Sequence, residues 1–410
     1  MKFNLNYRIF IIDKCVNSNL STRIAAQKLH LSERRIKQLK KVYKENNTLF
    51  AHGNKNKKPI NKTNDGLISS ILEIRKLDGY SESNFSHFTD LLKDYNNIDV
   101  SYSTVYRILK ANNYISPRKH KQKKIHRRRK PKETFGKMLQ TDATPHEFFK
   151  GNKKKYSLHG FIDDCTGVIT GLYLCENECL QGYFEITRQT LLNFGIPESI
   201  YADGSNVFFN SSKELTLEEQ LNGKKNNTQY GNIADYLGIE LIHARSAQAK
   251  GKIERLWNTL HDRLTIEFQI NNITNINEAN KFLPKFIKKY NRKFALDINN
   301  FDSSFVTFSK NDINLDILLS SKFDRICDSS NTISLNSKKF IVDTKEILHK
   351  EHVQIIINKK IGMKALYKDK LYKLIPIDTK NIDYIKNTSS SVDKIIQDFI
   401  FVNCLKSVKD

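Results

Sequence analysis

The sequence is poor in acidic residues relative to basic ones, and this deficit bears first on its partners. It has 44 Asp and Glu against 68 Lys and Arg, which gives a formal net charge of +24 at pH 7. A surplus of this size attracts polyanions, so DNA, RNA and an anionic membrane are all possible partners. Lys, Asn and Ile are abundant along the whole sequence, so the net charge can reflect overall composition and not a binding surface. The distribution of the charge is therefore more informative than its total.

Long apolar runs are also missing. No stretch approaches the length needed to cross a bilayer. The short apolar stretch at 9–12 is closed by Asp13 and Lys14, which disfavours a signal peptide. We therefore expect neither a membrane segment nor a membrane partner.

Cysteine is sparse and scattered, with six residues in 410. Only Cys175 and Cys179 are close in sequence, and no second pair or His cluster accompanies them to complete a zinc site. We interpret this pair as ordinary buried thiols at the end of a strand rather than as metal ligands. Scattered thiols favour a reduced, cytoplasmic protein.

A chain of this length exceeds one small core, so we expect several domains. Residues 1–50 are predicted to form a helix-turn-helix domain, with Ile24, Ala25 and Leu29 inward on one helix. Ser32 is a good N-cap for a second helix that turns Ile36 inward. The outward basic residues include three candidate DNA contacts, Arg34, Arg35 and Lys37. An ordinary helical hairpin with a solvated face is an equally good interpretation of this segment alone.

Residues 63–116 are predicted to form a second helix-turn-helix domain. Apolar residues at 67–72 and 88–95 mark two helices, and either Ser101 or Ser103 caps a third. Arg107 on its exposed face is a further candidate DNA contact. Two such units in series would contact two stretches of one DNA site.

The densest charge run in the chain lies in the predicted linker 117–133. In RKHKQKKIHRRRKPK, ten of fifteen residues are Lys or Arg, and no acid interrupts them. Self-repulsion and the small apolar area prevent such a block from folding alone. A merely solvated linker is the alternative, but its position favours phosphate contacts, with Arg127, Arg128 and Arg129 as candidates.

Residues 134–298 alternate strands and helices in the order expected of a ribonuclease-H-like fold, a mixed five-stranded sheet with helices on both faces. Strands are predicted at 137–141, 156–163, 168–174, 199–202 and 239–242, and helices at 183–194, at 231–237 and from about 247. A polar stretch at 211–229 is interpreted as an insertion. The class is α/β, preceded by all-α domains.

Residues 322–378 are predicted to form a small β-barrel, because five short strands fall within about fifty residues. The tail at 379–410 is predicted to be helical, with one short amphipathic helix.

Three acids fall at matching points of the central pattern. Asp142 is predicted to end the first strand and Asp203 the fourth, which would place both at one crevice of the sheet. Glu254 is predicted at the border of the buried stripe of the long helix. Three converging carboxylates require cations between them, and hard oxygen ligands select Mg²⁺ or Mn²⁺. Two such ions would support an in-line phosphoryl displacement.

The segment from 140 to 291 resembles the catalytic core of DDE transposases and retroviral-type integrases, and more narrowly the ISNCY group of bacterial insertion-sequence transposases. The resemblance rests on QTDATPHEFF, FIDDCTG, FGIPESIYADGSNVFF, TQYG and LGIELIHARSAQAKGKIERLWNTLHDRL. It implies a nucleoid-associated bacterial enzyme that cleaves strands at the inverted repeats of its element. It also implies joining of 3′-hydroxyl ends to target DNA with two metal ions, by at least a dimer, and no small-molecule substrate.

Residues near the three acids are given supporting roles. Lys250, Lys252 and Arg255 are candidate phosphate contacts, and a solvated surface is the alternative. Gly251 leaves room for a DNA backbone, although a merely tolerated glycine is possible. His243 ends the fifth strand near the expected scissile phosphate, and a structural histidine is nearly as good an interpretation.

Two other functions remain open. The chain could be a DNA-binding regulator derived from a transposase, although its intact acids argue against this. A ribonuclease H-type nuclease would share the metal chemistry, but it needs no tandem sequence reader.

Overall fold

The computed structural model describes most of the chain in two compact units, one ending at Ile71 and one beginning at Leu72. The described residues are 4–48, 63–117, 130–210, 227–244, 250–308, 314–336, 338–358 and 360–377. Three predicted features therefore lie wholly or largely outside them: the basic run, the insertion and the C-terminal tail.

The first unit contains a small three-helix core. Its helices are α1 (Leu5–Asn17), α2 (Thr22–Leu29) and α3 (Glu33–Asn46). Ser32 caps α3 as predicted, because its hydroxyl accepts the backbone N–H of Arg35. The predicted inward stripe was wrong at Ile24, which is 44% exposed; Ala26 is buried instead. Helix α1 was not predicted, and it supplies the third wall of this core.

The next three helices are α4 (Asp65–Lys76), α5 (Phe85–Asn96) and α6 (Tyr102–Ala111). Ser101 rather than Ser103 caps α6, because its hydroxyl accepts the N–H of Thr104. The buried face of α6 carries the three predicted residues, Val105, Ile108 and Leu109, and Arg107 is exposed. This separation of apolar and basic faces matches the prediction.

The central sheet has the predicted five strands, in the order β3-β2-β1-β4-β5. They are β1 (Leu139–His146), β2 (Tyr156–Asp163), β3 (Ile169–Cys175), β4 (Ser199–Ala202) and β5 (Glu240–His243). β2 runs antiparallel to both β1 and β3, whereas β4 is parallel to β1 and to β5. The carboxyl ends of β1, β3, β4 and β5 therefore face one edge, and this is the ribonuclease-H-like arrangement.

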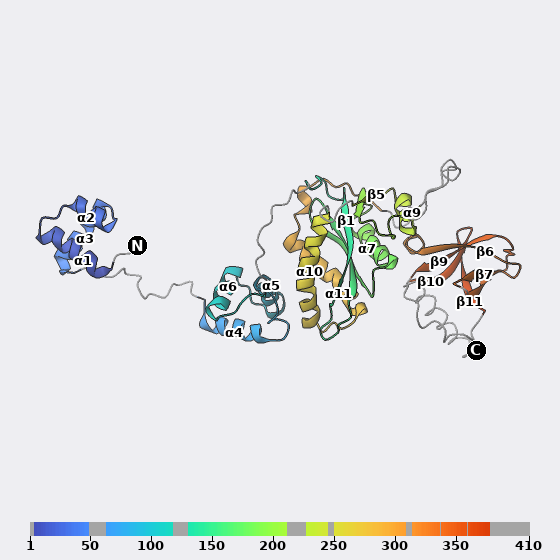
Figure 1. Ribbon diagram of the computed structural model, residues 1–410, viewed down its shortest axis with the longest axis horizontal. Helices are drawn as coiled ribbons and strands as arrows, with labels where there is room; N and C mark the ends of the chain where they lie inside the picture. Colours follow the sequence, from blue (N-terminus) through green and yellow to red (C-terminus); the bar gives the residue numbers. More distant parts are fainter. Residues whose placement is uncertain are drawn as a thin grey trace. The chain divides into compact units, whose positions relative to one another are not determined.

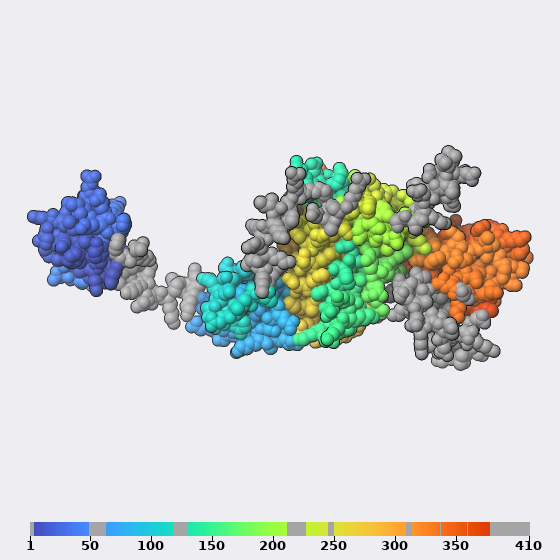
Figure 2. All heavy atoms as spheres, in the orientation of Figure 1, coloured from blue at the N-terminus to red at the C-terminus, as the bar shows by residue number. Residues whose placement is uncertain are grey.

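Helices cover both faces of this sheet (Figure 1). They are α7 (Leu180–Asn193), α9 (Gln229–Leu237), α10 (Gly251–Ile270) and α11 (Ile276–Phe294), followed by a short 3-10 turn, η2 (Ile298–Asn300). Helices α10 and α11 share a core with β2 and β3, and α7 and α9 share one with β1 and β4. The yellow α10 also reaches the surface in Figure 2. Three helix starts differ from the prediction: α7 begins at Leu180, α9 begins within the predicted insertion, and α10 begins at Gly251 instead of about 247. The helix α11 was not predicted.

Asp142 does not end its strand, so that prediction was wrong. It is the fourth residue of the eight-residue β1, which continues to His146. The strand continues because β2 pairs with it along its whole length, including Asp142 with Gly160. β4 pairs only with Leu139 and Gln140, so Asp142 lies just beyond the end of that neighbour.

A buried ionic cluster joins α5 to α10 and α11, and Glu267 on α10 is at its centre. Glu267 and His87 are both 0% exposed, and His87 Nε2 lies 3.4 Å from Glu267 Oε1. Lys289 Nζ donates to the same oxygen at 2.5 Å, and the Tyr95 hydroxyl donates to Oε2 at 2.6 Å. A second pair is formed by Arg263 and Asp90, 2.8 Å apart. The α5 helix is thus bonded to α10 and α11 through buried and partly buried side chains.

The C-terminal sheet has one strand more than predicted. After the short helix α12 (Leu315–Leu318) come β6 (Ser321–Ile326), β7 (Thr332–Leu335), β8 (Lys338–Asp343), β9 (His352–Asn358), β10 (Gly362–Tyr367) and β11 (Lys370–Pro376). Their antiparallel order is β6-β9-β10-β11-β8-β7. Arg325 on β6 donates from Nε to the Ser334 carbonyl on β7 at 2.7 Å, which nearly closes the sheet into a barrel. Among the described residues, no helix has the length and apolarity needed to span a bilayer.

Candidate active site

Asp142 and Asp203 lie at the same level, where β1 and β4 separate. The parallel register pairs Leu139 with Ile200 and Gln140 with Tyr201, and Asp203 follows directly after β4. Carried forward along both strands, this register sets Asp142 beside Asp203. The side chains are 23% and 44% exposed, so both carboxylates face a partly solvated edge of the sheet.

The ammonium of Lys250 bridges the two carboxylates. Its Nζ lies 3.0 Å from Asp142 Oδ1 and 3.4 Å from Asp203 Oδ2. Lys250 is the N-cap residue of α10 and is itself 7% exposed. A cation held between two carboxylates reduces their mutual repulsion, and it marks the point at which positive charge is most stabilised.

Trp257 fixes the orientation of Asp142. Its indole Nε1 donates to Asp142 Oδ2 at 3.0 Å, while Lys250 holds the other oxygen. The indole can lie against β2 because residue 160 is glycine: a Cβ there would be 2.7 Å from the ring. The glycine, the tryptophan and the aspartate therefore form one packed unit.

Glu254 lies in the first turn of α10, and its side chain is exposed. The only cluster of three metal-ligating side chains within the described ranges involves other residues, so the three carboxylates are not gathered as closely as 4.8 Å. The expectation that Glu254 faces the sheet rather than water was wrong, because its side chain is exposed.

His243 and Gly204 lie together beside Asp203. His243 ends β5 as predicted and pairs with Ala202 of β4. A Cβ on Gly204 would lie 2.6 Å from His243 Nε2, so the missing side chain makes room for the imidazole. The ring also packs edge-on against Phe209, with centroids 5.1 Å apart.

Glu178 is a fourth carboxylate at this edge, and it was not predicted from the sequence. Its Oε1 accepts the hydroxyl of the buried Tyr183 at 2.7 Å. Partial desolvation raises its pKa, and the charges of Asp203 and Asp142 raise it further. One signal was available: β3 runs in the same direction as β1, so residues after Cys175 must reach the edge that carries the two aspartates.

The other predicted contacts are placed as follows. Lys252 donates to the backbone carbonyls of Asp164 and Cys165, so its ammonium is held by protein rather than directed outward. Arg255 is exposed, and the position of a Cβ on Gly251 is open space. Gly251 is the first residue of α10, where glycine costs less than inside a helix. Arg34, Arg35, Lys37 and Arg107 are exposed, whereas Arg127, Arg128 and Arg129 lie outside the described residues.

Comparison with known proteins finds relatives over most of the chain. It is 30% identical over 374 residues to the transposase for insertion sequence IS1202 of Streptococcus pneumoniae, covering 82% of this chain and 78% of that protein. It is 28% identical over 290 residues to a Sinorhizobium fredii protein named as a transposase (y4bF), covering 70% of this chain and 62% of the other. No family model matches. Among solved structures, the HTLV-2 integrase catalytic core domain in complex with magnesium covers 39% of this chain and 88% of its own, with 18% identity and a TM-score of 0.28.

Proposed function

This chain belongs to the insertion-sequence transposases, and on that premise we propose that it cleaves DNA at the ends of its own element and joins the 3′-hydroxyl ends to target DNA. The observation that carries the proposal is the pair Asp142 and Asp203, held level at one sheet edge around a single bridging cation. Phosphoryl transfer needs positive charge at such a point, where the attacking and leaving oxygens develop negative charge.

We propose that Asp142, Asp203 and Glu254 hold two divalent ions, Mg²⁺ or Mn²⁺. The donors present are carboxylate oxygens, which these hard cations prefer. The Lys250 ammonium already occupies the point between two of these carboxylates, as a stand-in cation. When bound, the ions would activate the attacking oxygen and stabilise the leaving one. Glu254, on the turn that follows Lys250, is the ligand that must approach.

The protein's own contribution is orientation. Trp257 holds one oxygen of Asp142 in place and so leaves the other free to face the cation. His243 lies against the Asp203–Gly204 turn, where its ring can contact a phosphate brought to the aspartates. Displaced from between the carboxylates, Lys250 would be available to a DNA phosphate.

DNA binding is assigned to the helix-turn-helix units and the basic run. The exposed Arg34, Arg35, Lys37 and Arg107 would contact the element ends, together with Arg127, Arg128, Arg129 and Arg255. Lys252 remains a candidate only if its ammonium leaves the Asp164 and Cys165 carbonyls. Two ends must be brought together, so we propose a homodimer or a larger assembly on DNA.

The test uses purified full-length protein, Mg²⁺ and a duplex that carries one end of the element. We expect strand transfer by the wild type and by the control Asp262→Asn, an exposed acid on α10, and none by Asp203→Asn. Equal transfer by wild type and Asp203→Asn would show that the catalytic assignment is wrong. Specific end binding without any cleavage by the wild type would instead support the alternative, a regulator that has lost its chemistry.

A further inference from the structure

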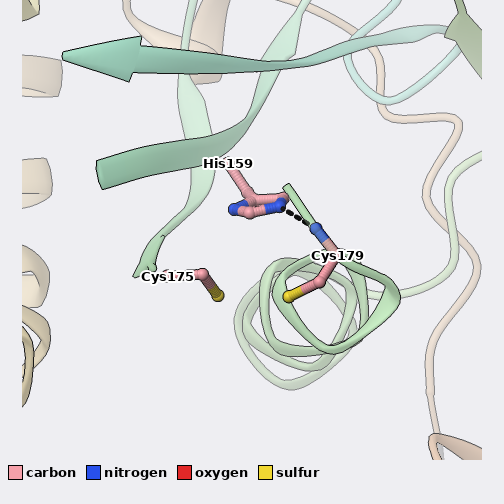
Figure 3. Close-up of side chains that lie close together, drawn as sticks. All are labelled: His159, Cys175 and Cys179. Atoms are coloured by element: carbon pink, nitrogen blue, oxygen red, sulfur yellow. Dashed lines mark hydrogen bonds between the residues drawn. The ribbon is translucent and has the colours of Figure 1, made fainter. Parts of the chain in front are cut away.

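A second cluster of metal-ligating side chains lies where β2, β3 and α7 meet. His159 comes from β2, Cys175 is the last residue of β3, and Cys179 is the N-cap of α7. One ligand atom from each lies within 4.8 Å of the other two. Figure 3 shows both thiols on the same side of the imidazole, directed toward each other. No histidine was assigned to this cysteine pair from the sequence, because His159 reaches the cysteines only through the pairing of β2 with β3.

The state of the imidazole suits a metal ligand. His159 is 0% exposed, so its ring has no contact with solvent. Its Nε2 accepts the backbone N–H of Cys179 at 3.1 Å, which requires the proton to be on Nδ1. This is the tautomer in which Nε2 can bind a cation, and a metal would replace that one hydrogen bond.

The ring is held in place by the helix beneath it. A Cβ on Gly182 would lie 2.6 Å from three atoms of the imidazole, so the ring lies flat against the backbone of α7. Tyr183 packs edge-on against the same ring, with centroids 4.8 Å apart. A ligand restrained in this way loses little entropy when it binds a metal.

The two cysteines also suit a thiophilic cation. Neither cysteine is in a disulfide, and Cys179 occupies the N-cap of α7 without a side-chain capping hydrogen bond. The amino end of a helix favours the thiolate, which is the form that binds metals. A spacing of three residues between cysteines falls in the range found at zinc sites. Tetrahedral zinc with Zn–S bonds of about 2.3 Å sets its sulfur ligands roughly 3.7 Å apart, and the ligand atoms of this cluster lie within 4.8 Å of one another.

We propose that His159, Cys175 and Cys179 form a zinc site with water in the fourth position. The site is distinct from the carboxylates in ligand chemistry, since two sulfurs and one nitrogen select zinc over Mg²⁺. Its effect on the enzyme would pass through the turn that the two cysteines bracket. That turn carries Glu178, whose carboxylate is close enough to Asp142 and Asp203 to be influenced by their charges. Zinc would act there as a structural clip.

The test is titration of the full-length, metal-free, reduced protein with Co²⁺, which reports thiolate ligands through a charge-transfer absorption in the near ultraviolet. We expect one equivalent of Co²⁺ to give this absorption and Zn²⁺ to abolish it. Cys175→Ser and Cys179→Ser should each lose or strongly weaken it. The matched control is Cys165→Ser, a buried thiol of the same domain outside the cluster, which should keep it. Asp203→Asn should also keep it, so failure of the proposed activity leaves this result standing.

Any of three results would overturn the proposal. One is that the wild-type protein binds Co²⁺ without any thiolate absorption. This test does not depend on the folding of any variant. The second is an absorption that persists in the Cys175→Ser, Cys179→Ser double variant. The third is a disulfide between Cys175 and Cys179. It is indicated if protein prepared without reductant has four titratable thiols out of six cysteines, and the zinc site is rejected if Co²⁺ also gives no signal after reduction.

Discussion

The two ends of α10 each carry carboxylate–lysine contacts, but they differ in burial and in the number of partners. At the first turn, Lys250 bridges Asp142 and the more exposed Asp203 at 3.0 and 3.4 Å. Near the last turn, Glu267 is fully buried and receives bonds from His87, Tyr95 and Lys289. The second cluster is complete within the protein. In the first, two partly exposed carboxylates share one ammonium, so a ligand from solvent can reach them.

The difference also appears in the electrostatics of Glu267. Burial alone would raise its pKa, but the His87 hydrogen bond and the Lys289 charge outweigh burial and lower the pKa to about 2. A buried carboxylate that stays ionised in this way joins α5 to the catalytic domain. The predictions below separate this structural role from the catalytic one.

The largest effect is expected from Glu254→Gln. If Glu254 completes the metal site, its loss removes several kcal/mol of transition-state stabilisation, and strand transfer falls on the order of 10³-fold. Stability should be unchanged, because the side chain is exposed. Single-turnover strand transfer and urea unfolding measure the two quantities. Full activity in Glu254→Gln would remove Glu254 from the site.

The opposite pattern is expected from Glu267→Ala. Loss of the Glu267 carboxylate leaves the His87 ring and the Tyr95 hydroxyl without their buried partner, so the free energy of unfolding should fall by roughly 3 kcal/mol. Lys289 keeps its ion pair with Asp94. The catalytic carboxylates keep their contacts, so Mn²⁺ affinity at a temperature where the variant is folded should match that of the wild type. Glu73→Ala, an exposed acid on the helix α4, is the control for stability. A loss of stability no larger in Glu267→Ala than in this control would contradict the structural role.

The stabilisation by Glu267 should depend on pH in a defined window. Its folded pKa, about 2, lies below the ordinary value of 4.5, so the stabilisation is fully present above pH 4.5 and is lost as the pH falls toward 2. A shift of this size corresponds to about 3 kcal/mol. Unfolding free energies of wild type and Glu267→Gln, measured from pH 7 to pH 3, should converge only below about pH 4.5. A constant difference down to pH 3 would contradict the assignment.

The smallest effect is expected from Lys250→Met. Removal of the ammonium leaves the two carboxylates without a cation. A partly exposed contact of this kind contributes up to about 1 kcal/mol, so its loss should make Mn²⁺ bind several-fold more tightly. Lys252→Met is the matched control, because its ammonium contacts backbone carbonyls and neither aspartate. Calorimetric titration measures both. Weaker Mn²⁺ binding in Lys250→Met would show that the lysine assists the metal instead of standing in for it.

Much of this architecture follows from the sequence, and the exceptions have physical causes. Short segments bounded by turn residues located all five core strands, and Ser32 and one of the pair Ser101 and Ser103 marked helix starts, because these signals are local. The end of β1 was misplaced because its length is set by pairing with β2. Glu267 is not distinguished by sequence, since its partners come from α5 and α11. The same holds for His159, which meets Cys175 and Cys179 only when β2 pairs with β3.

For the site itself, sequence placed Asp203 directly after β4 and identified His243 as the end of β5. It did not predict that Lys250 would bridge the aspartates, because the side chain of a lysine at a helix start can reach in several directions. It also missed Glu178, which follows the third strand at the shared edge. Prediction of Glu178 would have required residue type and strand direction to be considered together.

The central claim is that Asp142 and Asp203 form a divalent-metal site, and calorimetric titration of Mn²⁺ into the full-length protein tests it most directly. We predict saturable binding by the wild type and a loss of at least about tenfold in affinity, or about 1.4 kcal/mol, in both Asp142→Asn and Asp203→Asn. Asp262→Asn should bind as the wild type does. Equal affinity in all four proteins would contradict the account.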